Sequence, residues 1–149
     1  MLFRSLEENC DKLDEGKAVD VIYLDFAKAF DKVSHSMLAA KLEACGIGGE
    51  VLRWIKNWLE DRRQKVGIKG KYSDWVKVIS GVPQGSVLGP LLFLIYINDI
   101  DEGIISKISK FADDIKLCRE AGCETEARIL QDDLKRLAQW SEDWQCYLM

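Results

Sequence analysis

Two adjacent aspartates, Asp113 and Asp114, are the residues of this chain best suited to chemistry. They stand between two short stretches, 108–111 and 115–117, whose apolar or alternating pattern predicts the strands of a hairpin with the carboxylates at its turn. Two unit charges about 4 Å apart repel by roughly 4 kcal/mol at an effective dielectric constant near 20. A divalent cation would remove this repulsion, and Mg²⁺ prefers carboxylate oxygens. The pair therefore predicts either a magnesium site or a solvated β-turn, in which Asp is common.

A third carboxylate makes the metal site the stronger interpretation. Asp25 ends the stretch 19–24, which is rich in β-branched and aromatic residues and predicts a buried strand. A carboxylate at a strand end is well placed to join Asp113 and Asp114 around a cation.

Length and composition predict one domain over residues 1–149, with the charge and apolar content of an ordinary globular protein. The N-terminus becomes charged too soon for a signal peptide, and the longest apolar stretch, 87–97, is too short to span a bilayer. These features predict an intracellular protein without membrane contact, in the nucleus or the cytoplasm. The chain has five cysteines, an odd number without a C-x-x-C pair, and His35 is its single histidine. The cysteines argue against a disulfide framework and, with the lone histidine, against a zinc site. The single histidine also argues against a histidine-based triad.

One segment is basic although the whole chain has a net charge of −4. Residues 53–77 hold eight basic and three acidic residues, a local balance of +5, and they include Arg62, Arg63 and Lys65. Such a patch predicts either contact with a phosphate backbone or the solvated face of a helix and hairpin.

The periodicity of the chain predicts an α+β domain with helices on one face of an antiparallel sheet. The stripe Leu52, Ile55 and Leu59 marks one helix, and Trp54 and Trp58 beside it are expected in the core. The expected helices are 2–15, Ser34 or Ser36 to Ala44, 49–60, Ser86 to about Asp99, and 124–145; the expected strands are 19–25, 64–69, 75–80 and the hairpin 107–119.

Three segments, 23–33, 80–90 and 111–114, resemble in order and spacing motifs A, B and C of a reverse transcriptase palm. The closest resemblance is to non-LTR, LINE-like retrotransposons of the jockey type, and it extends through nearly the whole chain. It implies a partial reverse transcriptase domain over 1–149, with a palm, incomplete fingers and no thumb. One departure is Phe111, where many reverse transcriptases carry tyrosine.

The resemblance implies an RNA-directed DNA polymerase that transfers a nucleotide from a dNTP to a DNA primer 3′-hydroxyl on an RNA template. Asp25, Asp113 and Asp114 would be catalytic and would bind two Mg²⁺ ions, which Mn²⁺ can replace. The backbone carbonyl of Phe26 would add a metal ligand.

The resemblance also implies a nucleotide site at Phe26, Phe30, Gln84 and Gly85. Phe30 resembles the steric gate that excludes a ribose 2′-hydroxyl, and its alternative is core packing. Gln84 and Gly85 resemble the loop beside the incoming nucleotide, and their alternative is an ordinary loop before a helix cap. Arg62, Arg63 and Lys65 are the expected nucleic-acid contacts.

The polymerase regions that normally pack on this core lie outside the sequence, so the chain resembles a truncated copy of a larger polymerase. One alternative is a catalytically inactive retroelement remnant or a nucleic-acid-binding module that keeps the fold and the basic segment. A palm-type nucleotide cyclase is disfavoured, because its Gly-Gly-Asp-Glu-like signature is absent and the loop at Gln84 and Gly85 is present.

Overall fold

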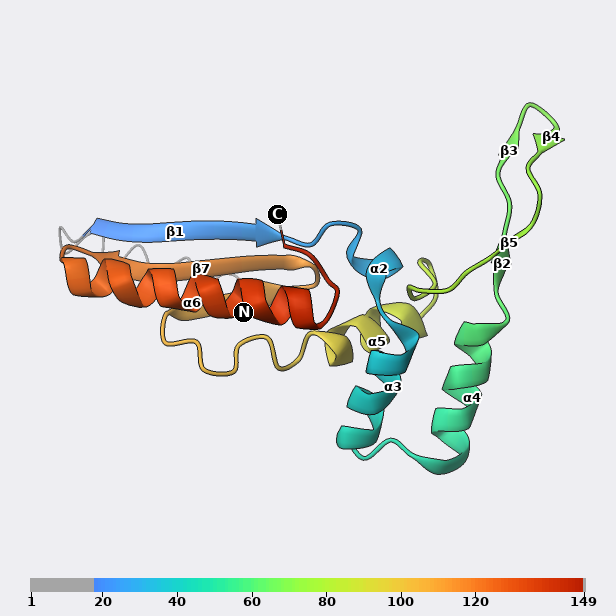
Figure 1. The fold of residues 1–149 in the computed structure, drawn as a ribbon, viewed down its shortest axis with the longest axis horizontal. Coiled ribbons are helices and arrows are strands. Elements are labelled where there is room, and N and C mark those ends of the chain that lie inside the picture. The colour runs from blue at the N-terminus through green and yellow to red at the C-terminus, as the bar shows by residue number, and fades with distance from the viewer. Residues whose placement is uncertain (1–17, 149) are drawn as a thin grey trace. The chain divides into compact units, whose positions relative to one another are not determined.

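The structure, a computed structural model, describes residues 18–148. The predicted helix 2–15 lies outside the described residues. The chain divides into two compact units, and each is described by itself (Figure 1). Within the described part, the first unit comprises residues 18–27 and 98–148, and the second comprises residues 28–97.

The first unit is built on a three-stranded antiparallel sheet. Strand β7 (Asp114–Ala121) lies between β1 (Ala18–Asp25) and β6 (Lys107–Phe111). Helix α6 (Glu124–Asp143) packs against β7 (Figure 1). Ile115 and Leu117 of the sheet are buried, as are Leu130 and Leu137 of the helix, so the core lies between these two layers. The predicted α+β class, the hairpin and the amphipathic helix are confirmed.

Strand β1 is an edge strand, and the prediction that it is buried is wrong. Ile22 and Leu24 lie opposite the buried Leu117 and Ile115, so these four residues share one face of the sheet. Tyr23 points to the other face and is 72% exposed. A run of β-branched and aromatic residues is typical both of a central strand and of a partly exposed edge strand. The sequence therefore could not distinguish a buried strand from an edge strand here.

The second unit contains four helices, α2 (Ala29–Lys32), α3 (His35–Ala44), α4 (Gly49–Glu60) and α5 (Leu88–Tyr96). Helix α3 packs against both α4 and α5. Helix α3 ends as predicted at Gly46, whose φ of +81° is one that glycine readily adopts. The Ile47 amide donates to the Leu42 carbonyl at 2.9 Å, as in a Schellman cap. The predicted stripe Leu52, Ile55 and Leu59 is buried, which confirms helix 49–60; the core also includes Leu38, Leu42, Leu92 and Phe93.

The expectation that Trp54 and Trp58 lie in the core is wrong for Trp54, which is 58% exposed. The two rings stack on each other, with centroids 6.3 Å apart and planes 15° apart. Neighbours at i and i+4 on a helix can cover one another without entering the core, so spacing alone could not place this pair.

The basic segment forms a hairpin whose ladder is broken into two short pieces, and the longer predicted strands 64–69 and 75–80 are not seen. Strand β2 (Arg63–Gln64) pairs with β5 (Val76–Lys77), and β3 (Gly67–Ile68) pairs with β4 (Lys71–Tyr72). Lys69 and Gly70 form the turn with φ of 49° and 78°. Two positive φ values are what a type I′ hairpin turn requires.

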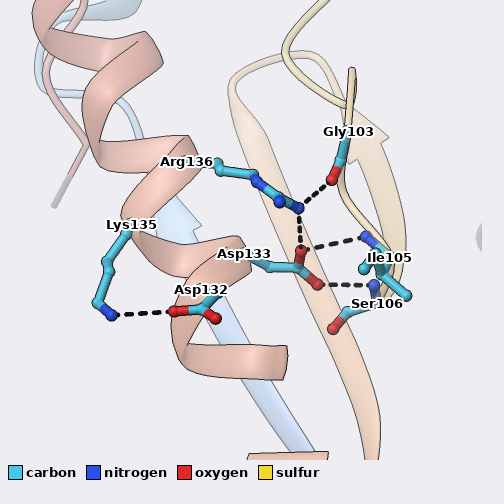
Figure 2. Close-up of polar contacts among 7 residues, drawn as sticks. All are labelled: Gly103, Ile105, Ser106, Asp132, Asp133, Lys135 and Arg136. Carbon is cyan, nitrogen blue, oxygen red and sulfur yellow. Dashed lines mark hydrogen bonds and ion pairs between the residues drawn. The ribbon is translucent and has the colours of Figure 1, made fainter. Parts of the chain in front are cut away.

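Asp133 of α6 fastens the segment that leads into β6 (Figure 2). Its carboxylate is buried and accepts from the amides of Ile105 at 3.1 Å and Ser106 at 2.7 Å, while Arg136 lies 3.5 Å away. Burial alone would raise the pKa of Asp133. The interactions with Ser106, the Ile105 amide and the Arg136 charge outweigh burial and lower the pKa below its ordinary value of 3.8.

We expect Asp133→Asn to destabilise the fold by about 2 kcal/mol, because one buried amide loses its charged acceptor. For a domain of this size that loss lowers the melting temperature by about 4–8 °C. The folded pKa is depressed, so the stabilisation is present above the unfolded pKa near 3.8 and is lost as pH falls toward the folded value. Thermal melts at pH 7 and pH 3 would measure both effects.

Asp132→Asn is the matched control, since Asp132 is exposed and pairs with Lys135 at 2.9 Å on the helix surface (Figure 2). Such pairs contribute less than about 1 kcal/mol. Equal melting temperatures for the two variants at pH 7 would contradict the role given to Asp133.

Within residues 18–148, no helix combines the length and the apolar character needed to cross a membrane.

Candidate active site

The first unit brings two of the predicted catalytic residues face to face. Asp25, the last residue of β1, is the register partner of Asp114, the first residue of β7. Directly opposed residues of an antiparallel pair have Cβ atoms about 4.5–5.5 Å apart and point to the same face of the sheet. Both side chains are exposed. Two carboxylates therefore converge at one end of the sheet, on the face that also carries Tyr23.

Asp113 lies beside this pair in the hairpin turn. Phe111 pairs with Asp114 across the hairpin, so Ala112 and Asp113 are the two turn residues. Ala112 has a φ of 53°, in the left-handed region that costs a residue with a Cβ about 1 kcal/mol or more. The short, strained turn places Asp113 directly before Asp114 of the opposed pair, whereas the sequence had predicted both aspartates at the turn.

Phe26, the residue after Asp25, is fixed by the C-terminal segment. It forms a β-bridge with Leu148, and the next amide, that of Ala27, donates to the Tyr147 carbonyl at 2.8 Å. The Phe26 ring is buried, with its centroid 6.1 Å from that of Trp140. The backbone that follows Asp25 is thereby held in place, including the Phe26 carbonyl that the family resemblance implies as a metal ligand.

The carboxylates at this end of the sheet fit a cation whose coordination shell is completed by a substrate, rather than one bound by protein ligands alone. Among the described residues, no group of three or more histidine, cysteine, aspartate or glutamate side chains is gathered closely enough to hold a metal ion. Mg²⁺ in nucleotide sites is usually held by one or two carboxylates together with phosphate oxygens and water. The opposed Asp25 and Asp114, with Asp113 adjacent, supply such a partial set.

The predicted nucleotide-binding residues Phe30, Gln84 and Gly85 belong to the second unit. The half-buried Phe30 ring lies 4.7 Å from the Phe93 ring, centroid to centroid, at 31°. Gln84 and Gly85 are exposed in the loop before α5, and Gly85 has a φ of +79°. This loop is therefore open to a ligand, while Phe30 is partly anchored in the core.

Ser86 acts as the predicted helix cap. Its hydroxyl accepts from the Gly89 amide at 2.9 Å and donates to the Pro83 carbonyl at 2.8 Å. The side chain thus satisfies an amide of the first turn of α5 and closes the loop that carries Gln84 and Gly85. Helix α5 begins two residues after Ser86, at Leu88, and helix ends defined by different criteria commonly differ by one or two residues.

The three predicted nucleic-acid contacts have different surroundings. Arg63 and Lys65 are exposed on the hairpin. The Lys65 ammonium lies 4.2 Å from the ring centroid of Tyr72 and 4.7 Å from that of Trp75. No role was expected for these two rings from the sequence, although the aromatic residues interspersed among the basic ones in 63–77 are a pattern typical of nucleic-acid contact.

Arg62 is turned inward instead. Its guanidinium donates to the Gly81 carbonyl, and to the Leu59 carbonyl at 3.3 Å. Partial burial lowers the pKa of Arg62. The structure thus gives Arg62 backbone partners and sets it apart from the exposed cations of the hairpin.

Comparison with known proteins shows the family to which the chain belongs. The family model described as reverse transcriptase (RNA-dependent DNA polymerase) matches residues 2–149. The chain is 33% identical to a probable RNA-directed DNA polymerase from transposon X-element of Drosophila melanogaster, and 31% identical to the RNA-directed DNA polymerase from mobile element jockey of Drosophila funebris. Each match covers 96% of this chain and 16% of the relative.

A solved structure of apo telomerase from Candida tropicalis has the same fold over 97% of this chain and 32% of its own, with a TM-score of 0.59 at 15% identity. The helices and antiparallel sheet are accordingly those of a partial polymerase palm. The family model covers nearly the whole chain, and the predicted motif residues lie within it. The chain therefore belongs to the reverse transcriptase (RNA-dependent DNA polymerase) family.

Proposed function

We propose that this chain is the palm core of an RNA-directed DNA polymerase that joins a dNTP to a primer 3′-hydroxyl on an RNA template. The observation that carries the proposal is the register of Asp25 against Asp114, with Asp113 in the adjoining turn, in a chain of this family. The chain spans 16% of the length of the X-element and jockey polymerases, so in a complete polymerase of this kind further regions would pack on this core.

Asp25, Asp113 and Asp114, with the Phe26 carbonyl, are the residues that would hold two Mg²⁺ ions, or Mn²⁺ in their place. When bound, such ions neutralise charge on the attacking and leaving oxygens of an in-line displacement. The register of Asp25 against Asp114 supports this assignment, because both carboxylates project from paired strands at one end of the sheet. The Phe26–Leu148 bridge keeps the backbone beside Asp25 from shifting.

Phe30, Gln84 and Gly85 are proposed to contact the incoming nucleotide. Packing against Phe93 restrains the Phe30 ring, which suits a residue that excludes a 2′-hydroxyl by its shape. Gly85 has no side chain and a φ of +79°, so its backbone can approach a nucleotide closely.

The exposed hairpin of residues 63–77 is proposed to bind the nucleic-acid strand. Arg63 and Lys65 supply charge to phosphates, and the rings of Tyr72 and Trp75, both more than half exposed, offer faces for bases. Lys65 already lies against these rings, so charge and stacking surfaces are gathered at one place.

We expect Arg63→Ala/Lys65→Ala to weaken binding of single-stranded RNA and to reduce the slope of log affinity against log salt by about 1.4, since each phosphate contact contributes about 0.7. Trp75→Ala is expected to weaken the binding free energy by about 1–3 kcal/mol, because a stacking surface is lost. The slope of log affinity against log salt should change little, since no charge is removed. Fluorescence anisotropy of a labelled RNA over a salt series measures both. Arg128→Ala removes an exposed arginine from α6 and is the control; an equal loss there would rule out the hairpin as the binding surface.

Primer extension on a poly(rA)–oligo(dT) duplex with dTTP tests the proposed function. Extension that requires Mg²⁺ or Mn²⁺ is the expected result. A second candidate is a nucleic-acid-binding module without turnover, which the exposed basic hairpin favours. Salt-sensitive binding that is indifferent to Mg²⁺, together with no extension by the folded chain, would select this second function and reject the first.

A further inference from the structure

Two side-chain donors from segments distant in the sequence converge on one backbone carbonyl, that of Gly81. His35, the first residue of α3, places Nε2 2.9 Å from this oxygen and donates to it with the proton on that nitrogen. Arg62, two residues beyond α4, donates to the same oxygen through Nη2. The His35 Nε2 and the Arg62 Nη2 atoms are 3.5 Å apart. A carbonyl oxygen has two lone pairs, so the Gly81 oxygen can accept from His35 and from Arg62 at the same time.

The same residue is also bound through its backbone to the segment that carries Phe30. The Gly81 amide donates to the Val33 carbonyl at 2.8 Å, and the Val82 amide donates to the Phe30 carbonyl at 2.7 Å. The Ser80 hydroxyl adds a bond to the Asp31 carbonyl at 2.8 Å. Residues 80–82 are thus fastened along residues 30–33.

Only glycine fits at this crossing. Gly81 has a φ of +84°, and a Cβ built on it would lie 2.8 Å from the Cα and carbonyl oxygen of Asp31 and from the carbonyl oxygen of Phe30. All three are backbone atoms, so a side chain at this position could not be accommodated by a rotamer change. The close approach leaves the Gly81 carbonyl buried, and an unpaired buried carbonyl would cost about 1–3 kcal/mol. His35 and Arg62 satisfy it.

The loop beyond Gly81 has supports at its two ends. The first is the Gly81 anchor, which we define as His35, Arg62 and the bonds from 80–82 to 30–33. The second is the Ser86 cap at the start of α5. Gln84 and Gly85 lie between them and are exposed. The position of these two residues relative to Phe30 therefore depends on the Gly81 anchor.

We propose that His35 and Arg62 are positioning residues that hold the loop 81–86, and hence Gln84 and Gly85, in a fixed place beside Phe30. The inference rests on the proposed nucleotide-binding role of that loop. It assigns a function to His35, the single histidine of the chain, whose isolation in the sequence had only argued against a zinc site and a histidine-based triad. It also separates Arg62 from its neighbour Arg63, which is free to serve the hairpin surface.

Backbone amide exchange, followed by NMR on the full chain, tests the anchor without reference to activity. In Arg62→Ala and His35→Ala, exchange of the Gly81 and Val82 amides should be at least tenfold faster. The amides of α5 and of the β6–β7 hairpin should keep their rates, because neither variant touches them. His35→Gln, which retains a donor, should restore part of the protection. The matched control is Arg53→Ala, since Arg53 is an exposed α4 arginine that pairs with Glu50.

Steady-state primer extension tests the consequence for nucleotide binding. Arg62→Ala should raise KM for dTTP about tenfold and lower kcat by a smaller factor, since the anchor places the loop and touches no reacting atom. Unchanged exchange at Gly81 and Val82, or equal acceleration of all amides, would overturn the anchor. Faster local exchange with an unchanged KM would overturn its link to nucleotide binding. A wild-type chain without extension would count against the proposed function, while the exchange rates would still decide the anchor.

Discussion

Replacing Asp25 by asparagine is expected to lower the rate of primer extension about a thousandfold or more. Asparagine keeps the size of the side chain and removes the charge that opposes Asp114 across the strand pair. Loss of about 4 kcal/mol of charge stabilisation in the transition state corresponds to three powers of ten in rate. Single-turnover extension of a labelled primer with Mg²⁺ measures the effect on the chemical step.

Asp20→Asn is the control for this variant. Asp20 is an exposed carboxylate on the same strand, five residues earlier, and its register partner is Arg119. The variant should extend primers at the wild-type rate. Comparable losses in Asp20→Asn and Asp25→Asn would show that general charge on β1 matters, and that the end of the sheet has no special role.

The second large effect is expected at Phe30. Phe30→Val shortens the side chain, and we expect it to improve use of UTP relative to dTTP by about 10- to 200-fold, the range in which pocket shape discriminates. The ratio of kcat/KM for the two nucleotides is the measurement. A ratio unchanged from wild type would leave Phe30 as a packing residue only.

Phe93→Leu separates selectivity from packing. The rings of Phe30 and Phe93 lie 4.7 Å apart, so both substitutions remove the same aromatic contact and should lower stability. Only Phe30→Val shortens the proposed gate itself. A similar change in nucleotide preference for both variants would attribute the effect to loosened packing.

The sequence correctly predicted those elements whose hydrophobic pattern is compatible with only one kind of secondary structure. The stripe Leu52, Ile55 and Leu59 requires a helix, and the alternating flanks of Asp113 require a hairpin, and both were found with nearly the predicted bounds. The sequence could not place side chains that depend on neighbours distant in the chain. Trp54 was expected in the core and is exposed, since no distant segment among residues 18–148 covers it and its ring stacks only partly on that of Trp58.

The candidate site shows the same division. Spacing and motif resemblance singled out Asp25 and Asp114, and the register places them opposite each other. Asp133 and the Gly81 anchor escaped notice, since their partners are backbone groups that carry no mark in the sequence. Arg62 was grouped with the basic segment by its charge, whereas its surroundings depend on where the Gly81 carbonyl lies.

The most direct test of the central claim is Mn²⁺ binding, followed by electron paramagnetic resonance, in the presence of dTTP and a primer–template that cannot be extended. The wild-type chain is expected to bind Mn²⁺ in this complex, and Asp113→Asn/Asp114→Asn is expected to weaken that binding more than tenfold. Asp20→Asn should bind as the wild type does. Equal Mn²⁺ binding by the wild type and the double variant would contradict the account, because the carboxylates at the end of the sheet would then hold no metal.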